Sequence, residues 1–132
     1  MIAIPESYRD LLTIPVAILV TNGPDGYPQT TALWFLYDED GGLRISLNTA
    51  RQKVKNLRAD PHCTLFFIDP ANPYRTLEVR AQATLEDDPD YAFATRVGAK
   101  YGADMRQNDA PGDRRVVVTL QPVKVNTWPP GG

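Results

Sequence analysis

Four basic side chains within ten consecutive residues form the clearest chemical signal in this sequence. They are Arg51, Lys53, Lys55 and Arg58. With Asp60 they give the stretch a net charge of +3, whereas the whole protein carries −2. Guanidinium and ammonium groups donate charge-assisted hydrogen bonds to phosphate and carboxylate oxygens. The stretch could therefore bind an anionic ligand, and the alternative is a basic, solvated helix face that binds nothing.

These cations are predicted to lie on a short helix that follows a strand. Residues 43–47 alternate apolar and polar side chains, which is the pattern of a half-buried strand. Thr49 stands three residues before Gln52, the spacing of a capping box that opens a helix. The Asp60-Pro61 dipeptide would end this helix because the residue before a proline avoids the helical conformation. The unpaired amides of the first turn would strengthen the attraction for an anion.

The other predicted elements are short strands joined by turns, with two more short helices. Turn-forming residues at 22–26 predict a hairpin between a strand at 16–21 and a return strand at 29–37. Asp88-Pro89 is typical of a helix start, and this helix would continue to about Tyr101. The remaining predicted elements are a helix at 5–12 and strands at 62–69, 74–85 and 115–128.

Six short strands favour one antiparallel architecture, because a closed or nearly closed barrel hides their edges. Pro122, inside the last strand, predicts an edge position or a bulge there. With 132 residues, 42% of them apolar and 23% charged, the chain has the size and composition of one domain. We therefore expect a single domain over residues 1–132, mainly β with short helices.

Composition and charge argue against several classes of function. A pI near 5.3 lacks the basic excess of nucleic-acid-binding proteins. No segment resembles a signal peptide or a membrane span, so we expect a cytoplasmic protein that does not bind membranes. The single cysteine, Cys63, lies in an apolar run and is expected to be buried. His62 would point to the opposite face of the same strand, so we predict neither a metal site nor a catalytic side-chain constellation.

Several motifs, taken in order, resemble the split-barrel flavin and deazaflavin oxidoreductases, the relatives of pyridoxamine 5′-phosphate oxidase. The most specific is the string KVKNLRADP at 53–61, which follows a predicted strand. The other motifs are Gly26-Tyr27-Pro28-Gln29, Trp34-Phe35, residues 78–83, and residues 114–118 with Trp128 near the end of the chain. Within the family, the chain is similar to short proteins of actinobacterial type that are classed as probable coenzyme F420-dependent enzymes.

The resemblance implies an FMN-binding split barrel of Greek-key type. It also implies a homodimer with a flavin-like cofactor in each of two grooves at the interface. The positions that match those holding the cofactor's phosphate or acidic tail are Ser46, Arg51, Lys53 and Lys55. The positions that match those lining the isoalloxazine or deazaflavin ring are Gln29 and Thr31. The residue types alone support the assignment of a phosphate site. They do not by themselves indicate that Gln29 and Thr31 line a ring.

The activity that the resemblance implies is hydride transfer from reduced F420 to a planar or conjugated organic small molecule. One alternative is an FMN-dependent oxidase or reductase, and another is a non-catalytic protein that binds a flavin or haem. Gln52 stands where pyridoxamine-phosphate oxidases have arginine, which argues against oxidation of vitamin B6.

Overall fold

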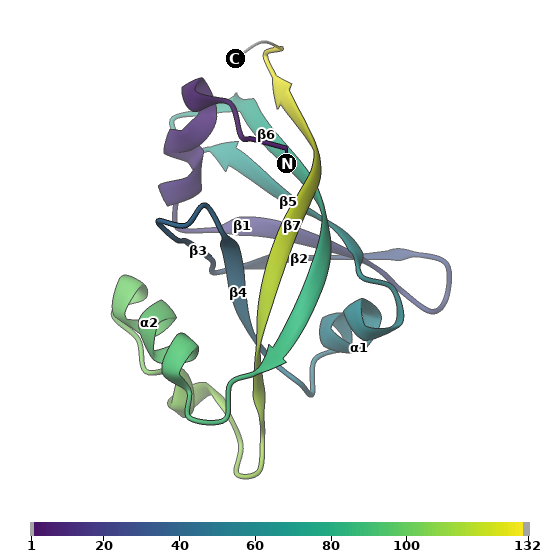
Figure 1. Cartoon of the computed structure of the whole chain (residues 1–132), viewed down its shortest axis with the longest axis vertical. Helices are drawn as coiled ribbons and strands as arrows, with labels where there is room; N and C mark the ends of the chain where they lie inside the picture. Colours follow the sequence, from purple (N-terminus) through teal and green to yellow (C-terminus); the bar gives the residue numbers. More distant parts are fainter. Residues whose placement is uncertain (1, 131–132) are drawn as a thin grey trace.

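In the computed structural model, which describes residues 2–130, seven antiparallel strands form one sheet that curls on itself (Figure 1). Hydrogen-bonded neighbours follow the order β2-β1-β5-β6-β7-β4-β3. The strands are β1 (Ala17–Asn22), β2 (Pro28–Leu33), β3 (Leu36–Tyr37), β4 (Leu43–Asn48), β5 (His62–Asp69), β6 (Asn72–Asp87) and β7 (Arg115–Trp128). The α-helices are α1 (Gln52–Ala59) and α2 (Ala92–Tyr101), and the 3-10 helices are η1 (Glu6–Thr13) and η2 (Met105–Asn108). The mainly β, barrel-like architecture is therefore as predicted.

The edges of the sheet, β2 and β3, come from one predicted strand that the structure divides. A continuous strand over 29–37 is wrong because Phe35 leaves the ladder and turns its ring fully into the core. Side chains of α2 satisfy its backbone instead. The Phe35 amide donates to Tyr101 Oη at 3.3 Å, and its carbonyl oxygen accepts from Lys100 Nζ at 2.9 Å. The chain crosses here from one edge of the sheet to the other, and in the described residues β2 and β3 are not paired.

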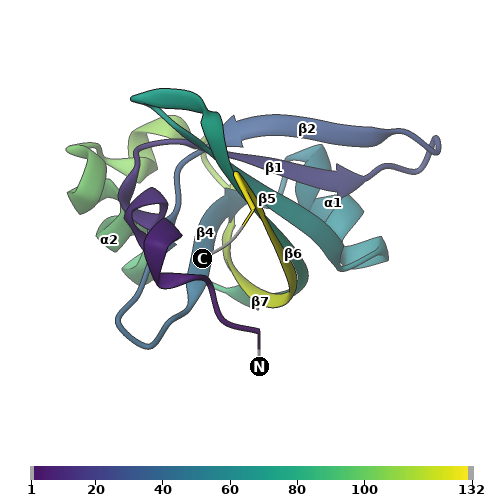
Figure 2. The ribbon, with the colours of Figure 1, turned by 90° about the horizontal axis from the view of Figure 1, so that it is seen from above.

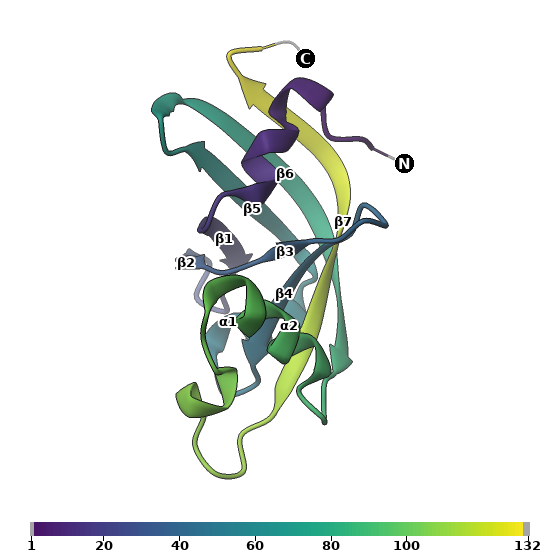
Figure 3. The same cartoon turned by 90° about the vertical axis from the view of Figure 1, so that its left-hand side faces the viewer.

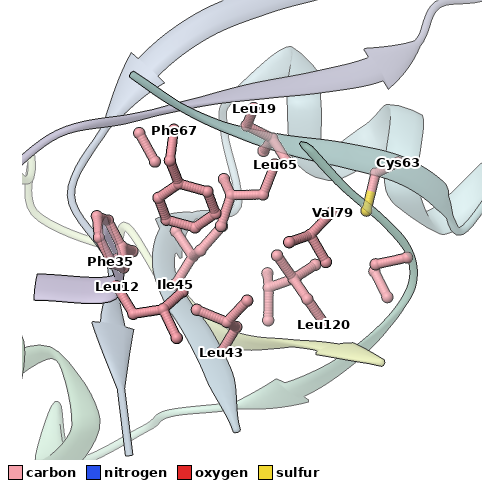
Figure 4. Close-up of a cluster of buried hydrophobic side chains, with 14 of the residues drawn as sticks. Leu12, Leu19, Phe35, Leu43, Ile45, Cys63, Leu65, Phe67, Val79 and Leu120 are labelled. Atoms are coloured by element: carbon pink, nitrogen blue, oxygen red, sulfur yellow. The ribbon is translucent and has the colours of Figure 1, made fainter. Parts of the chain in front are cut away.

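Alternate residues of the strands fill the interior of the barrel (Figure 4). The buried face of β6 is the predicted one and consists of Leu77, Val79, Ala81 and Ala83. Phe35 and Phe67 meet edge to face in this core, with their ring centroids 5.2 Å apart. Cys63 is buried here as expected, and burial raises the pKa of its thiol to about 12. A thiol that stays protonated at neutral pH is a poor nucleophile.

A bulge at Pro122 interrupts the pairing of β7 with β6. Ala81 pairs with Pro122, whereas the preceding residue, Arg80, pairs with Lys124, so Val123 is an extra residue on β7. Pro122 also lies beyond the part of β7 that pairs with β4. The bulge predicted from the proline is confirmed.

A second, smaller layer, made of α2 and η2, covers part of the outer face of the sheet. Phe93 and Val97 of α2 and Met105 of η2 pack with Val117 of β7 in this layer. α1 lies on the opposite side of the barrel from α2, beside the β1–β2 hairpin (Figures 1 and 2). Figure 3 shows η1 lying across one end of the barrel. Among the described residues, no helix has the length and hydrophobicity that a membrane crossing requires.

The start of α2 differs from the prediction. Asp88-Pro89 is not its first turn, because Tyr91 adopts a left-handed backbone conformation (φ 56°) and the helix begins at Ala92. The Asp88 carboxylate still reaches the helix start: it accepts from the Phe93 amide at 3.2 Å and the Ala94 amide at 2.9 Å. Asp88 therefore satisfies free amides of α2 from outside the helix.

Candidate functional site

Asn48 holds the turn that leads into α1, where a capping box was predicted. Its side-chain oxygen Oδ1 accepts from the Ala50 amide at 2.9 Å, and its backbone carbonyl accepts from the Arg51 amide at 3.1 Å. Arg51 is the N-cap residue and makes no side-chain cap hydrogen bond within residues 2–130. Thr49 donates its amide to the Arg114 carbonyl at 2.9 Å. The capping-box prediction is therefore wrong, although the helix itself is present.

Lys53 is half-buried between α1 and β2. Its ammonium Nζ donates to Thr31 Oγ1 at 3.2 Å, the one acceptor it has within the described residues. Burial, and after it the positive charge of Arg51, lower the pKa of Lys53 below its ordinary value of 10.5. An anion placed beside this ammonium would restore the electrostatic stabilisation that burial removes. Lys53 therefore has the environment of a group that binds an anionic ligand.

Asn56, a residue that is only 2% exposed, joins α1 to β1 and β2 through its carboxamide. Its amide Nδ2 donates to Thr21 Oγ1 and to Gln29 Oε1, both at 3.1 Å. Its Oδ1 accepts from Gln52 Nε2 at 2.8 Å. Gln29 and Thr31 are alternate residues of β2 on its half-buried side, so both face α1. The structure thus brings Gln29, Thr31 and Lys53 together, as the predicted cofactor site requires.

A pocket of about 390 Å³ opens between the β1–β2 hairpin and α1. Its lining residues are Gln29, Gln52, Asn56 and the hairpin residues Gly23, Pro24, Asp25, Tyr27 and Pro28. Gln29 Nε2 has no protein partner within residues 2–130, where no buried side-chain polar atom is left without one. Solvent therefore reaches Gln29 Nε2, and a ligand could accept a hydrogen bond from it. We call Gln29, Thr31, Gln52, Lys53 and Asn56 the α1–β2 site.

Ser46 lies in a different polar cluster, where its Oγ accepts from Arg115 Nη1 at 3.2 Å. Arg115 makes a two-point contact with Asp109, from Nε to Oδ2 at 2.8 Å and from Nη2 to Oδ1 at 2.9 Å. Asn48 Nδ2 and Tyr91 Oη also donate to the Asp109 carboxylate, at 3.0 and 2.6 Å. We call these five residues the Arg115 network.

The Arg115 network is largely buried and internally satisfied. The side chains of Arg115 and Asp109 are 7% and 4% exposed. The hydrogen bonds from Arg115, followed by those from Tyr91 and Asn48, lower the pKa of Asp109 to about 2 against the opposing effect of burial. Such a buried, fully paired ion pair holds its surroundings in one arrangement and leaves little hydrogen-bonding capacity for a ligand.

Arg51 and Lys55 lie on the exposed side of α1. Neither makes a hydrogen bond or ion pair through its side chain within the described residues. The charge of Arg51 contributes to lowering the pKa of Lys53, after burial, and that of Asp113, after its hydrogen bond from Asn48. Arg51 therefore lies near both polar clusters. The cofactor-binding roles of all six predicted positions stay predictions: Gln29, Thr31, Ser46, Arg51, Lys53 and Lys55.

Asn56 and Arg115 were not predicted as site residues, although both stand in the motifs at 53–61 and 114–118. The helical position of Asn56 did not mark it as buried, because the neighbouring Lys55 is exposed. Arg115 could not be paired with Asp109 from the sequence, because Asp109 stands in a segment without periodicity. Among the described residues, no group of three or more histidine, cysteine or acidic side chains could hold a metal ion.

Comparison with protein families gives one match that spans almost the whole chain. The family is described as pyridoxamine 5′-phosphate oxidase, and its model matches residues 4–129. The chain belongs to this family. Its members are flavin-binding oxidoreductases, so the split-barrel fold and the class of protein inferred from the motifs are confirmed.

Several solved structures are similar to this chain. One named F420 Reductase is 37% identical, with a TM-score of 0.81 over 93% of this chain and 98% of that chain. A conserved hypothetical protein from Mycobacterium tuberculosis is 25% identical, with a TM-score of 0.75 over 96% and 86%. A putative pyridoxamine 5′-phosphate oxidase from Listeria innocua shares the fold at 21% identity, with a TM-score of 0.70 over 93% and 96%. No curated protein matches the chain.

Proposed function

We propose that this protein is an oxidoreductase that uses reduced coenzyme F420 to transfer hydride to a planar or conjugated organic small molecule. The observation that carries the proposal is the half-buried Lys53 ammonium, which has one neutral acceptor and lies beside Gln29 and Thr31. The oxidoreductase family and the 37% identity to a structure named F420 Reductase support it.

The α1–β2 site fits a cofactor that has an anionic end and a planar ring with hydrogen-bond acceptors. Lys53 would donate a charge-assisted hydrogen bond to a phosphate oxygen. Gln29 would donate from Nε2 to an acceptor on the ring, and Thr31 would line the ring beside it. The bound deazaflavin supplies the hydride. The residues of this chain therefore bind and orient the cofactor, and none has to act as a nucleophile.

A homodimer that completes the cofactor groove is part of the proposal. Two large aromatic side chains support it, since Tyr74 is 79% exposed and Trp128 59%. Both belong to the end of the β6–β7 pair where Thr76 lies opposite Trp128. Exposed aromatic residues are enriched at protein interfaces. Light scattering during size-exclusion chromatography should give twice the mass of one chain, and a monomer at all concentrations would contradict this part.

Binding titrations of the purified protein with F420 and with FMN, in one buffer, test the cofactor. Tight binding of F420 and weak binding of FMN, followed by oxidation of reduced F420 with a quinone acceptor, would support the proposal. The reverse preference would assign the protein to the FMN-dependent oxidases and reductases. Tight binding without turnover of any acceptor would indicate a non-catalytic binding protein, and binding of neither would leave α1 as a solvated basic helix.

A further inference from the structure

We propose that Asn56 is a positioning residue that fixes the orientation of the Gln29 carboxamide, so that Gln29 offers an N–H donor, not a carbonyl oxygen, to the ligand. The orientation is a property of the protein without ligand. Its consequence for affinity rests on the proposed function, because it requires a ligand in the α1–β2 site.

The hydrogen bonds of Asn56 define this orientation. Both hydrogens of Nδ2 are used, one toward Thr21 Oγ1 and one toward Gln29 Oε1. Gln52 occupies Oδ1 from the same helix, one turn earlier. Asn56 is 2% exposed and Thr21 also 2%, so water does not compete for these contacts. With its oxygen held by Asn56, Gln29 turns Nε2 away from Asn56 and toward solvent.

The Asn56→Asp substitution should reverse the carboxamide of Gln29. A carboxylate only accepts hydrogen bonds, so it would repel Gln29 Oε1 and attract Gln29 Nε2. Thr21 and Gln52 can both donate to the same carboxylate, which offsets part of the cost of burying its charge. Gln29 would then present its carbonyl oxygen to the pocket, and a ligand acceptor would meet another acceptor.

A ligand with an acceptor atom at this point is therefore favoured over one with a donor there. The carbonyl groups of a flavin or deazaflavin ring are acceptors of this kind. Gln29→Glu gives a second, independent variant, because Asn56 still donates to one carboxylate oxygen while the other replaces Nε2. Both variants should oppose binding of the ring for the same reason, although the altered residue differs.

The matched control is Arg58→Ala. It changes the net charge by −1, as each acidic variant does, and Arg58 is an exposed residue of α1 outside the hydrogen-bond network. Any loss of affinity that is shared with this control is a charge effect. Any loss of affinity found only in Asn56→Asp and Gln29→Glu comes from replacing the N–H donor at position 29 with an acceptor.

The orientation is read first by NMR of the ¹⁵N-labelled protein without ligand. In the wild type, the Gln29 side-chain amide protons should exchange rapidly with water and the Asn56 amide protons should show contacts to Thr21. In Asn56→Asp, the Gln29 amide protons should become protected, because they now donate to the buried carboxylate. Equal exchange of the Gln29 protons in both proteins would overturn the inference, whatever ligand the protein binds.

The consequence is then measured with two phosphate-free probes, the 5-deazaflavin chromophore of F420 with its sugar-alcohol chain and riboflavin. For the probe that the wild type binds, Asn56→Asp and Gln29→Glu should each lose about tenfold or more in affinity, and Arg58→Ala about twofold or less. Unchanged affinity in both acidic variants would overturn the inference. If the wild type binds neither probe nor F420 nor FMN, the proposed function fails, and the NMR experiment alone decides the orientation of Gln29.

Discussion

The α1–β2 site and the Arg115 network both combine basic side chains with amides and hydroxyls, yet their environments differ. In the network, the Arg115 guanidinium makes a two-point contact with Asp109, and both side chains are less than a tenth exposed. In the α1–β2 site, Lys53 meets one neutral hydroxyl, and the Gln29 amide nitrogen faces an open pocket. Residue type alone therefore does not identify a ligand site here.

The two regions differ in how many hydrogen-bond donors are left for a ligand. A buried cation that is fully paired stabilises one arrangement of its surroundings, and removing its partner leaves an uncompensated charge. A half-buried cation without an anionic partner has a lowered pKa, which an anionic ligand would raise again. We therefore expect substitutions in the Arg115 network to change mainly stability and substitutions in the α1–β2 site to change mainly ligand affinity.

The largest expected effect is the loss of stability in Asp109→Ala. The variant leaves the buried Arg115 guanidinium without its carboxylate, which should lower the free energy of unfolding by about 3–5 kcal/mol. Urea denaturation measures this change. Glu86→Ala is the control, because Glu86 is an exposed acid on β6, and it should change stability by less than about 0.5 kcal/mol. Similar losses in the two variants would remove the distinction between the network and the surface.

A smaller loss of stability should appear on acidification. The folded-state pKa of Asp109, about 2, lies below its ordinary value of 3.8, so its contribution to stability is complete above that value. As the pH falls from about 4 to 2, the protein should lose roughly 2 kcal/mol from this group. In Asp109→Asn this part of the pH dependence should be absent. An identical pH dependence of stability in wild type and variant would show that Asp109 is not held in the ionised form by Arg115.

Cofactor affinity should fall as the pH rises, because Lys53 loses its charge at high pH. This is the opposite direction from the acid-induced loss of stability at Asp109. Below the lowered pKa of Lys53 the ammonium is charged and attracts a phosphate; as the pH rises through that pKa, at a value under 10.5, the charge and the attraction are lost. The affinity should fall by about tenfold across this range. Lys53→Arg keeps its charge and should bind at high pH without that fall. Parallel profiles for the two proteins would mean that Lys53 does not contact the anion.

The sequence predicted the elements whose side chains alternate or repeat, because local periodicity alone is enough to define them. The strands at β5 and β7 and the buried face of β6 are of this kind. The break at Phe35 could not be predicted, since its backbone partners, Lys100 and Tyr101, come from a helix more than sixty residues later. Sequence patterns within one segment cannot predict contacts between residues so far apart in the chain.

The candidate site was predictable to a similar extent. The positive charge of α1 is visible in the sequence, but which of its cations is half-buried depends on how the helix packs on β2. Lys53 faces Thr31, whereas Lys55 faces solvent. The capping box failed because Asn48 organises the turn with its own side chain, one residue before the predicted Thr49. The side chain of Ser46 contacts Arg115 of β7, a residue that sequence spacing does not connect to it.

The most direct test of the account compares Lys53→Ala with Arg58→Ala in titrations of whichever cofactor, F420 or FMN, the wild type binds more tightly. The two variants remove the same charge from the same helix, at a half-buried and at an exposed position. Lys53→Ala should weaken binding by roughly 10- to 100-fold, because a charge-assisted hydrogen bond is lost. Arg58→Ala should weaken it by about threefold or less, because solvent screens an exposed charge. Equal losses in the two variants would contradict the assignment of the α1–β2 site as the place where the cofactor's anionic end binds.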